Sequence, residues 1–130
     1  MTDRRAFLAG ALGLAAQQGW TVYAPTMRDG MYGLIGRTKA VPGQRDALLA
    51  ILLEGTASMP GCLSYIIARD PEDADALWIT EVWDSRESHV GSLQLPAVQA
   101  AIARARPLIA GFDNRHETEP VGGVGLRRAA

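Results

Sequence analysis

The run from Ala76 to Trp83 constrains the fold of this chain more than any other stretch. It is rich in aliphatic, aromatic and Thr residues and follows the turn-rich segment from Asp70 to Asp75, a pattern typical of a buried strand. Because side chains alternate along a strand, Glu81 and Trp83 share one face with apolar neighbours. The predicted strand therefore carries a carboxylate on an apolar surface.

A helix is expected to follow this strand almost at once. Asp84 and Glu87 have the spacing of a capping box, which predicts a helix that begins at Asp84 and runs to Leu95. His89 then lies in the second turn. The residues expected on the same helical face are Arg86, Val90 and Leu93. Any chemical site is expected at this corner between strand and helix.

Further segments complete the predicted fold. Strands are expected at 31–40, 62–69 and 111–119, and helices at 44–58 and 97–105, with Pro60 and Pro96 as breaks. The order β-α-β-β-α-β is that of a split βαβ unit of the ferredoxin-like type. The chain is therefore predicted to be an α+β protein in which helices cover one face of an antiparallel sheet.

The second face of this sheet also needs a cover. The segment 62–69 has few polar residues on either face, so we interpret it as a central strand that is buried on both sides. The polar segment 111–119 is typical of an edge strand. Because the helices cover only one face, a second copy of the chain packed sheet against sheet would cover the other. We therefore predict a homodimer.

Length and charge limit the classes of function. A chain of 130 residues is expected to form one domain, and its net charge of -1 with a single lysine leaves no basic stripe for a nucleic acid. Cys62 is the only cysteine, so an intramolecular disulfide is excluded, and we interpret it as a small buried hydrophobe. The two histidines, His89 and His116, lack the spacing of metal ligands, and no metal site is predicted.

The ends of the chain differ from its middle. Arg4 and Arg5, followed by an apolar run to Ala16, resemble a twin-arginine export signal, which implies a periplasmic location; otherwise a cytoplasmic one is expected. The run is shorter than the ~20 residues that span a membrane, so no stable membrane insertion is predicted. The alternative is an N-terminal helix that packs on the domain. We interpret 17–30 as a linker, 31–120 as the domain and 121–130 as a glycine-rich tail.

Three motifs resemble the antibiotic biosynthesis monooxygenase family, especially its quinol monooxygenase-like members. They are Tyr32 to Arg37, Pro60 to Tyr65, and Ile79 to Ser85 followed by His89. The resemblance covers roughly residues 31–120 and implies a dimeric α+β barrel built from two ferredoxin-like units. It also implies a pocket between the sheet and the helices of each subunit.

The resemblance further implies a reaction. Some members oxidise quinols or polyketide hydroxy-aromatics with molecular oxygen and without flavin, haem or metal, so no cofactor is expected here. An electron-rich phenol, once deprotonated, can itself reduce oxygen. The protein then needs only to bind it, remove a proton and stabilise the anion. The implied partners are a small quinol or polyphenolic aromatic and molecular oxygen.

Each site residue has a role that the resemblance implies. His89 is the implied base, because its unperturbed pKa lies near neutrality. Trp83 and Tyr65 are the implied aromatic walls, and the Tyr65 hydroxyl is an implied donor to a substrate oxygen. The remaining implied substrate-binding residues are Glu81, which would orient His89, Arg37, which would hold an anionic substrate, and Leu93.

These roles have plainer alternatives. His89 can be a solvated or capping residue near the start of a helix, and Trp83 can belong to the core. Glu81 can form an ion pair with Arg37 or Arg115 across the sheet. His116 is expected to be exposed on the edge strand.

Two other functions fit parts of the sequence. Haem-degrading members of the family use an asparagine on the first strand and a histidine on the later helix beside the tryptophan. Here Gly36 and Ile102 stand in those places and only Trp83 matches, so haem degradation is not predicted. A dimeric barrel that binds a small apolar ligand without turnover is the alternative, because such a pocket needs few polar groups.

Overall fold

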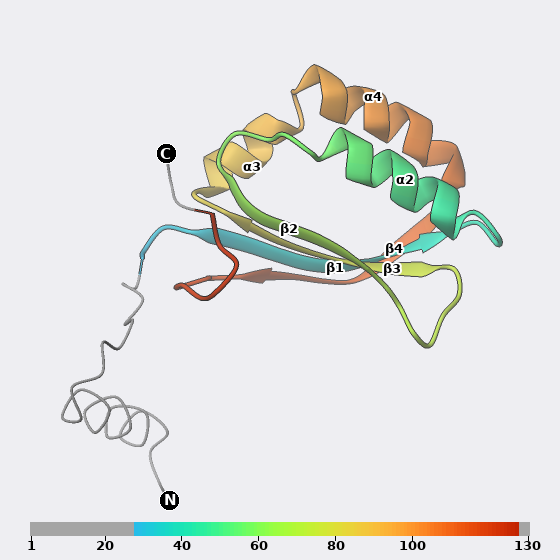
Figure 1. The fold of residues 1–130 in the computed structure, drawn as a ribbon, viewed down its shortest axis with the longest axis horizontal. Helices are drawn as coiled ribbons and strands as arrows, with labels where there is room; N and C mark the ends of the chain where they lie inside the picture. The colour runs from blue at the N-terminus through green and yellow to red at the C-terminus, as the bar shows by residue number, and fades with distance from the viewer. Residues whose placement is uncertain (1–27, 128–130) are drawn as a thin grey trace, which may run out of the picture.

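Four antiparallel strands form one sheet, and the helices lie together on one of its faces (Figure 1). The structure is a computed structural model that describes residues 28–127. Its elements are β1 (Tyr32–Ala40), α2 (Arg45–Gly55), β2 (Cys62–Arg69), β3 (Ala76–Trp83), α3 (Arg86–Ser92), α4 (Pro96–Ala105), the 3-10 turn η1 (Arg106–Leu108) and β4 (Ile109–Thr118). The predicted signal at 1–16 and most of the predicted linker lie outside the described residues.

The strand order is β2-β3-β1-β4, and the three neighbouring pairs are antiparallel. This is the predicted α+β fold of the ferredoxin-like type, with β4 at an edge as expected. The prediction that 62–69 forms a central strand is wrong: β2 is the other edge, and Ile66 on it is 58% exposed. The apolar pattern of β2 does not fix its position in the sheet. The crossover through α2 separates β2 from β1, and β3 is the strand that pairs with β1.

The helix-facing side of the sheet is buried in two separate clusters. At one end of the β1–β3 pair, Ala40 and Leu77 pack with Leu48, Ile51, Ala101 and Ala105 of the helices. At the other end, the cluster contains Tyr32, Leu34, Met59, Trp83 and Val98. The register pairs Tyr32 with Trp83 and Lys39 with Ala76, so the clusters lie at opposite ends of these strands. The region between them is left for a cavity.

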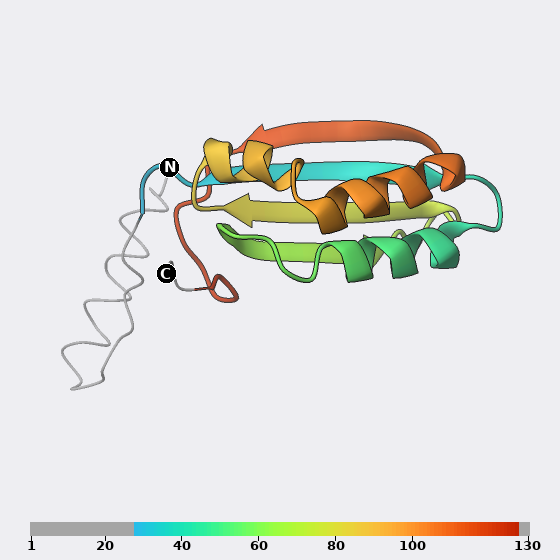
Figure 2. The ribbon, with the colours of Figure 1, turned by 90° about the horizontal axis from the view of Figure 1, so that it is seen from above.

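Helices α2 and α4 pack side by side over the sheet (Figure 2). Gly55 makes this possible, because a Cβ atom there would lie 2.3 Å from the Cβ of Ala101. The two helices therefore approach at a point where neither has more than a methyl group. Beyond α4, strand β4 lies past the edge of the helical layer, and most of its residues are exposed.

The start of α3 differs from the prediction by one residue. Ser85, not Asp84, is the N-cap, and its side chain accepts a hydrogen bond from the backbone N–H of Ser88. Asp84 instead donates its backbone N–H to Gly61 O at 2.9 Å, which ties the helix entry to the start of β2. The chain turns at Leu93 to Leu95, and Pro96 occupies the first turn of α4 rather than preceding it.

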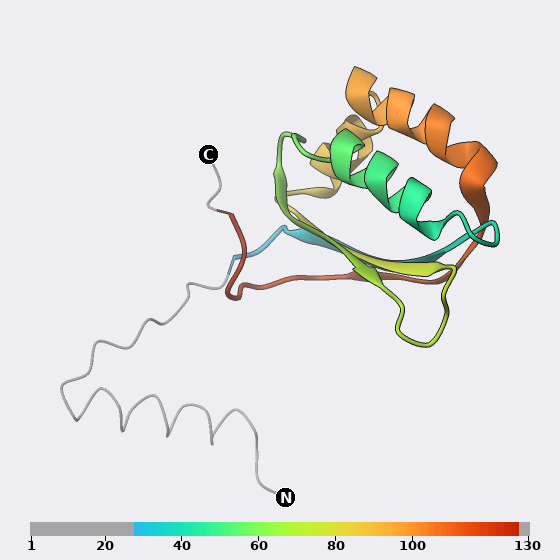
Figure 3. The same ribbon diagram turned by 45° about the vertical axis from the view of Figure 1, so that its right-hand side comes forward.

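In the part of the chain that the structure describes, all the helices lie on one side of the sheet, and none covers the second face (Figure 3). It carries Ile35, Ile66, Trp78 and Val82, and the connection between β2 and β3 projects past this side of the sheet. Within residues 28–127, no helix is long and apolar enough to cross a membrane.

Candidate functional site

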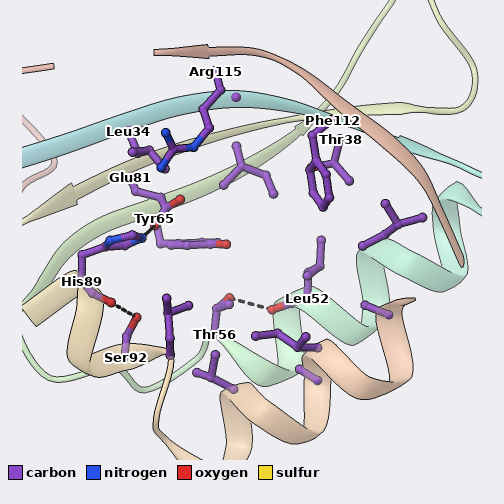
Figure 4. Close-up of a pocket in the computed structure, with 18 of the residues that line it drawn as sticks. Leu34, Thr38, Leu52, Thr56, Tyr65, Glu81, His89, Ser92, Phe112 and Arg115 are labelled. Atoms are coloured by element: carbon purple, nitrogen blue, oxygen red, sulfur yellow. Dashed lines mark hydrogen bonds and ion pairs between the residues drawn. The ribbon is translucent and has the colours of Figure 1, made fainter. Parts of the chain in front are cut away.

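A cavity of about 690 Å³ lies between the sheet and the helices (Figure 4). Its wall is formed by residues from every strand and from α2, α3 and α4. All the residues that the sequence singled out contribute to this wall: His89, Trp83, Tyr65, Glu81, Arg37 and Leu93. The corner between β3 and α3 thus opens on the space that separates the two buried clusters.

Glu81 binds Trp83 more closely than it binds His89. The Trp83 indole Nε1–H donates to Glu81 Oε1 at 3.0 Å, while His89 Nε2 lies 3.9 Å from the same oxygen. The second distance is too long for a hydrogen bond. Glu81 therefore fixes the orientation of the Trp83 ring, which is fully buried, and its carboxyl group lies near His89.

His89 is held between aromatic rings at one end of the cavity. Its ring centroid lies 5.2 Å from that of Tyr32 and 5.5 Å from that of Trp83, the latter in an edge-to-face arrangement. Burial lowers the pKa of His89 from its usual value, and the positive charges of Arg115 and Arg86 lower it further. The imidazole is therefore neutral at neutral pH and can accept a proton.

Tyr65 and Glu81 are two further polar groups at this end. Burial raises the pKa of Tyr65 well above its usual value, so the phenol stays protonated and can donate a hydrogen bond. Figure 4 shows the Tyr65 hydroxyl directed into the cavity. Burial also raises the pKa of Glu81, while the bond from Trp83 and the charge of Arg115 act in the opposite direction.

Arg37 lines the cavity, but its positive charge is paired with the carboxylates of Asp113 and Asp70. The guanidinium donates to Asp113 through Nε at 2.8 Å and through a terminal nitrogen at 2.6 Å, and it lies 3.3 Å from Asp70. Asp70 also accepts the Trp78 Nε1–H on the sheet face away from the helices. Because side chains alternate along β1, the Arg37 side chain belongs to that far face.

Arg115 is the arginine that the sequence reasoning missed as a site residue. It comes from β4, lines the cavity, and extends toward Leu34 and Glu81 in Figure 4. The polar sequence of β4 gave no alternating pattern from which its direction could be deduced. Its positive charge acts on both His89 and Glu81.

The remainder of the wall is apolar. Away from His89 the lining includes Leu52, Ala105, Ile109 and Phe112. Phe112 is 70% exposed and stands at the flank that the helices leave open along β4. Over residues 28–127, no three His, Cys, Asp or Glu side chains are grouped as a metal site requires. The cavity thus has a polar end, near His89, and a longer apolar end.

Comparison with known proteins identifies the family of the chain. Residues 31–104, more than half of the chain, match the family model described as antibiotic biosynthesis monooxygenase. A crystal structure of a candidate antibiotic biosynthesis monooxygenase from Chloroflexus aurantiacus is 69% identical, with a TM-score of 0.73, and the match covers 75% of this chain and 99% of that one. No protein among those with curated functions matches the chain.

More distant structures share the fold. A candidate antibiotic biosynthesis monooxygenase from Caulobacter crescentus is 22% identical, with a TM-score of 0.65, over 72% of this chain and 92% of that one. At this identity the likeness supports the fold alone. The match to the family model over residues 31–104 agrees with the motifs of strands β1, β2 and β3. The chain belongs to the antibiotic biosynthesis monooxygenase family.

Proposed function

We propose that this chain is a cofactor-independent monooxygenase that oxidises a small quinol or polyphenolic aromatic with molecular oxygen. The observation that carries the proposal is the position of His89, a neutral imidazole at the polar end of a largely apolar cavity. A base in such a place favours a flat, mainly apolar substrate with an ionisable hydroxyl group, because the ring is desolvated while its hydroxyl meets a proton acceptor.

The proposed reaction takes its electrons from the substrate. Removal of a phenolic proton gives an electron-rich anion that reduces oxygen. One oxygen atom forms a new carbon–oxygen bond on the ring, and the other leaves as water. Quinol and oxygen thus give hydroxyquinone and water, and the ring supplies all the electrons that the two oxygen atoms take up.

The side chains at the polar end have separate tasks in this reaction. His89 accepts the phenolic proton, and the Tyr65 hydroxyl donates a hydrogen bond to a substrate oxygen as negative charge develops. Trp83, held by Glu81, forms a rigid aromatic wall against which the ring packs. Leu93, which is 44% exposed, lies at the rim.

Oxygen uptake by metal-free protein tests this function. With a panel of hydroquinones and a chelator present, we expect uptake by the unmodified chain and a loss of about 100-fold in rate for His89→Ala, the usual effect of removing a general base. His116→Ala is the matched control, because His116 lies outside the cavity wall, on the sheet face away from the helices, and light scattering shows whether this variant keeps the proposed dimer. No uptake over the whole panel would favour a barrel that binds a small apolar ligand without turnover.

Two properties of the whole protein belong to the same proposal. We infer a homodimer that packs through the sheet face without helices. We also infer export through the twin-arginine motif at Arg4 and Arg5, which lies outside the described residues. If protein recovered from its native host kept these arginines, the N-terminal segment would be structural and the export proposal would fail.

A further inference from the structure

Strand β4 contains an irregularity at the place where it passes the cavity. Ile35 of β1 pairs with His116, and Arg37 pairs with Asp113, so the single residue Gly36 lies opposite both Asn114 and Arg115. Two residues against one is a β-bulge. Asn114 has a φ of 49°, in the left-handed region that asparagine tolerates better than most residues.

The bulge decides which face Arg115 occupies. In an unbroken ladder from the Arg37–Asp113 pair, Asn114 would stand opposite Gly36 and Arg115 opposite Ile35, on the face away from the helices. The extra residue shifts the alternation by one position, so that Arg115 is directed into the cavity instead. β-Bulges often change the direction of a side chain next to a functional site.

Gly36 leaves room for this arrangement. Its neighbours on the same face of β1, Leu34 and Thr38, are buried side chains, whereas Gly36 leaves a gap in the floor of the cavity. A Cβ atom at Gly36 would meet nothing nearer than the Arg115 Cα at 4.0 Å. A larger side chain there would occupy the space over which Arg115 extends.

The charges on the cavity wall favour an anion at this point. Arg37 and Asp113 bind each other, which leaves Glu81 as the remaining carboxylate of the lining against the two arginines Arg106 and Arg115. Among the described residues, no carboxylate lies within ion-pair distance of Arg115. Its guanidinium therefore has donors available for a ligand.

We propose that the Asn114 bulge delivers Arg115 as the group that binds an anionic oxygen of the ligand, a carboxylate or a deprotonated phenol. The polar end of the cavity then selects flat aromatic anions over neutral analogues of the same shape. A guanidinium suits this task, because it offers several N–H donors to one or two oxygen atoms. The proposal deepens the proposed function by naming the charge of the ligand, and it rests on the same cavity.

Calorimetric titration with two isosteric probes tests the proposal without oxygen chemistry. The probes are 2-naphthoate, an anion, and 2-naphthamide, its neutral analogue, added to the full chain at low salt. We expect naphthoate to bind about tenfold more tightly, the effect of one charge-assisted hydrogen bond of ~1.4 kcal/mol. Arg115→Gln should abolish this preference while the affinity for naphthamide stays the same.

Matched variants separate Arg115 from other sources of positive charge. Arg106→Gln removes the other arginine of the lining that pairs with no carboxylate among residues 28–127, and this variant should keep the preference. Asn114→Gly should also keep it, because glycine adopts positive φ readily, whereas Asn114→Val should lose it as the bulge is strained. Thermal unfolding shows whether each variant is folded.

Several outcomes would overturn the proposal. Equal binding of both probes, binding of neither, a preference that survives Arg115→Gln, or one lost in Arg106→Gln would each contradict the role of Arg115. A preference that persists in folded Asn114→Val would contradict the role of the bulge. A preference for naphthoate without any oxidation of hydroquinones would leave this inference standing and reject the oxygenase function.

Discussion

The chemistry of His89 is set by its immediate surroundings. Isolated histidine titrates near neutrality, but here two rings desolvate the imidazole, and Arg86 and Arg115 disfavour its charged form. Arg86 also stacks on the Tyr32 ring, 4.6 Å from its centroid. Arg86 therefore contacts the ring that packs against His89, and its charge lowers the pKa of His89. A neutral imidazole at physiological pH follows from this arrangement.

Substitution of Arg115 should move the titration of His89. In the proposed reaction the neutral imidazole is the base, so activity should fall as the pH drops through the His89 pKa, which lies below the usual 6.5. In Arg115→Gln one repelling charge is lost, the pKa rises, and the acid limb of the rate profile should move to higher pH. NMR of the imidazole signals measures the pKa directly.

The assignment of these signals is simple because the chain has only two histidines. His116→Asn leaves the resonance of His89 alone in the spectrum. A His89 pKa that does not change in Arg115→Gln would contradict the electrostatic coupling between these residues.

At the scale of elements, the short helix α3 is the part that holds His89, the proposed base. It spans only Arg86 to Ser92, too short to be stable without support from its ends and neighbours. The Ser85 cap satisfies a backbone N–H at its start, and the contact between Asp84 and Gly61 fixes its entry. Because His89 lies within this helix, its position depends on the cap.

Loss of the cap should cost stability. We expect Ser85→Ala to lower the free energy of unfolding by about 1 kcal/mol, since a helical N–H loses its partner, and Ser85→Asp to retain it because aspartate is an equally good cap. Urea denaturation measures both. An unchanged stability in Ser85→Ala together with a loss in Asp84→Ala would indicate that Asp84 is the cap, as the sequence pattern predicted.

At the scale of the whole molecule, the sheet face opposite the helices is the face that no helix within residues 28–127 covers. Ile66 is 58% exposed, and Ile35, Trp78 and Val82 are only partly buried. Arg37, Asp70 and Asp113 add a network of ion pairs to the same face. An apolar centre with charged groups around it is typical of a surface that binds another protein.

A charge placed on this face should weaken the proposed dimer. We expect the unmodified chain to be dimeric at micromolar concentration, and Ile66→Glu to shift it toward monomer, because the buried carboxylate would have no partner. Leu53→Glu is the matched control, since Leu53 is 56% exposed on α2, on the helical side. Light scattering that gives a monomer for the unmodified chain would reject the dimer.

Most of the elements were predictable from the sequence, because their signals are local. Strand β3 and the following helix were predicted from the run of apolar residues and the turn after Trp83, and β2 and β3 have the predicted limits. The placement of His89, Trp83, Glu81 and Tyr65 on one cavity follows from the alternation of strands and the second turn of α3. Periodicity along the chain is enough for such deductions, because each side chain's direction depends only on its own strand or helix.

Only the tertiary structure decided how these elements relate to one another. An apolar pattern on both faces of β2 was compatible with a central strand, and the crossover of α2 made β2 an edge. The direction of Arg115 depends on the bulge opposite Gly36, because a single extra residue reverses the alternation, and the polar sequence of β4 carries no trace of that shift. The sequence by itself predicted the family, most of the elements and the candidate base; pairing between strands determined which charges share the cavity with His89.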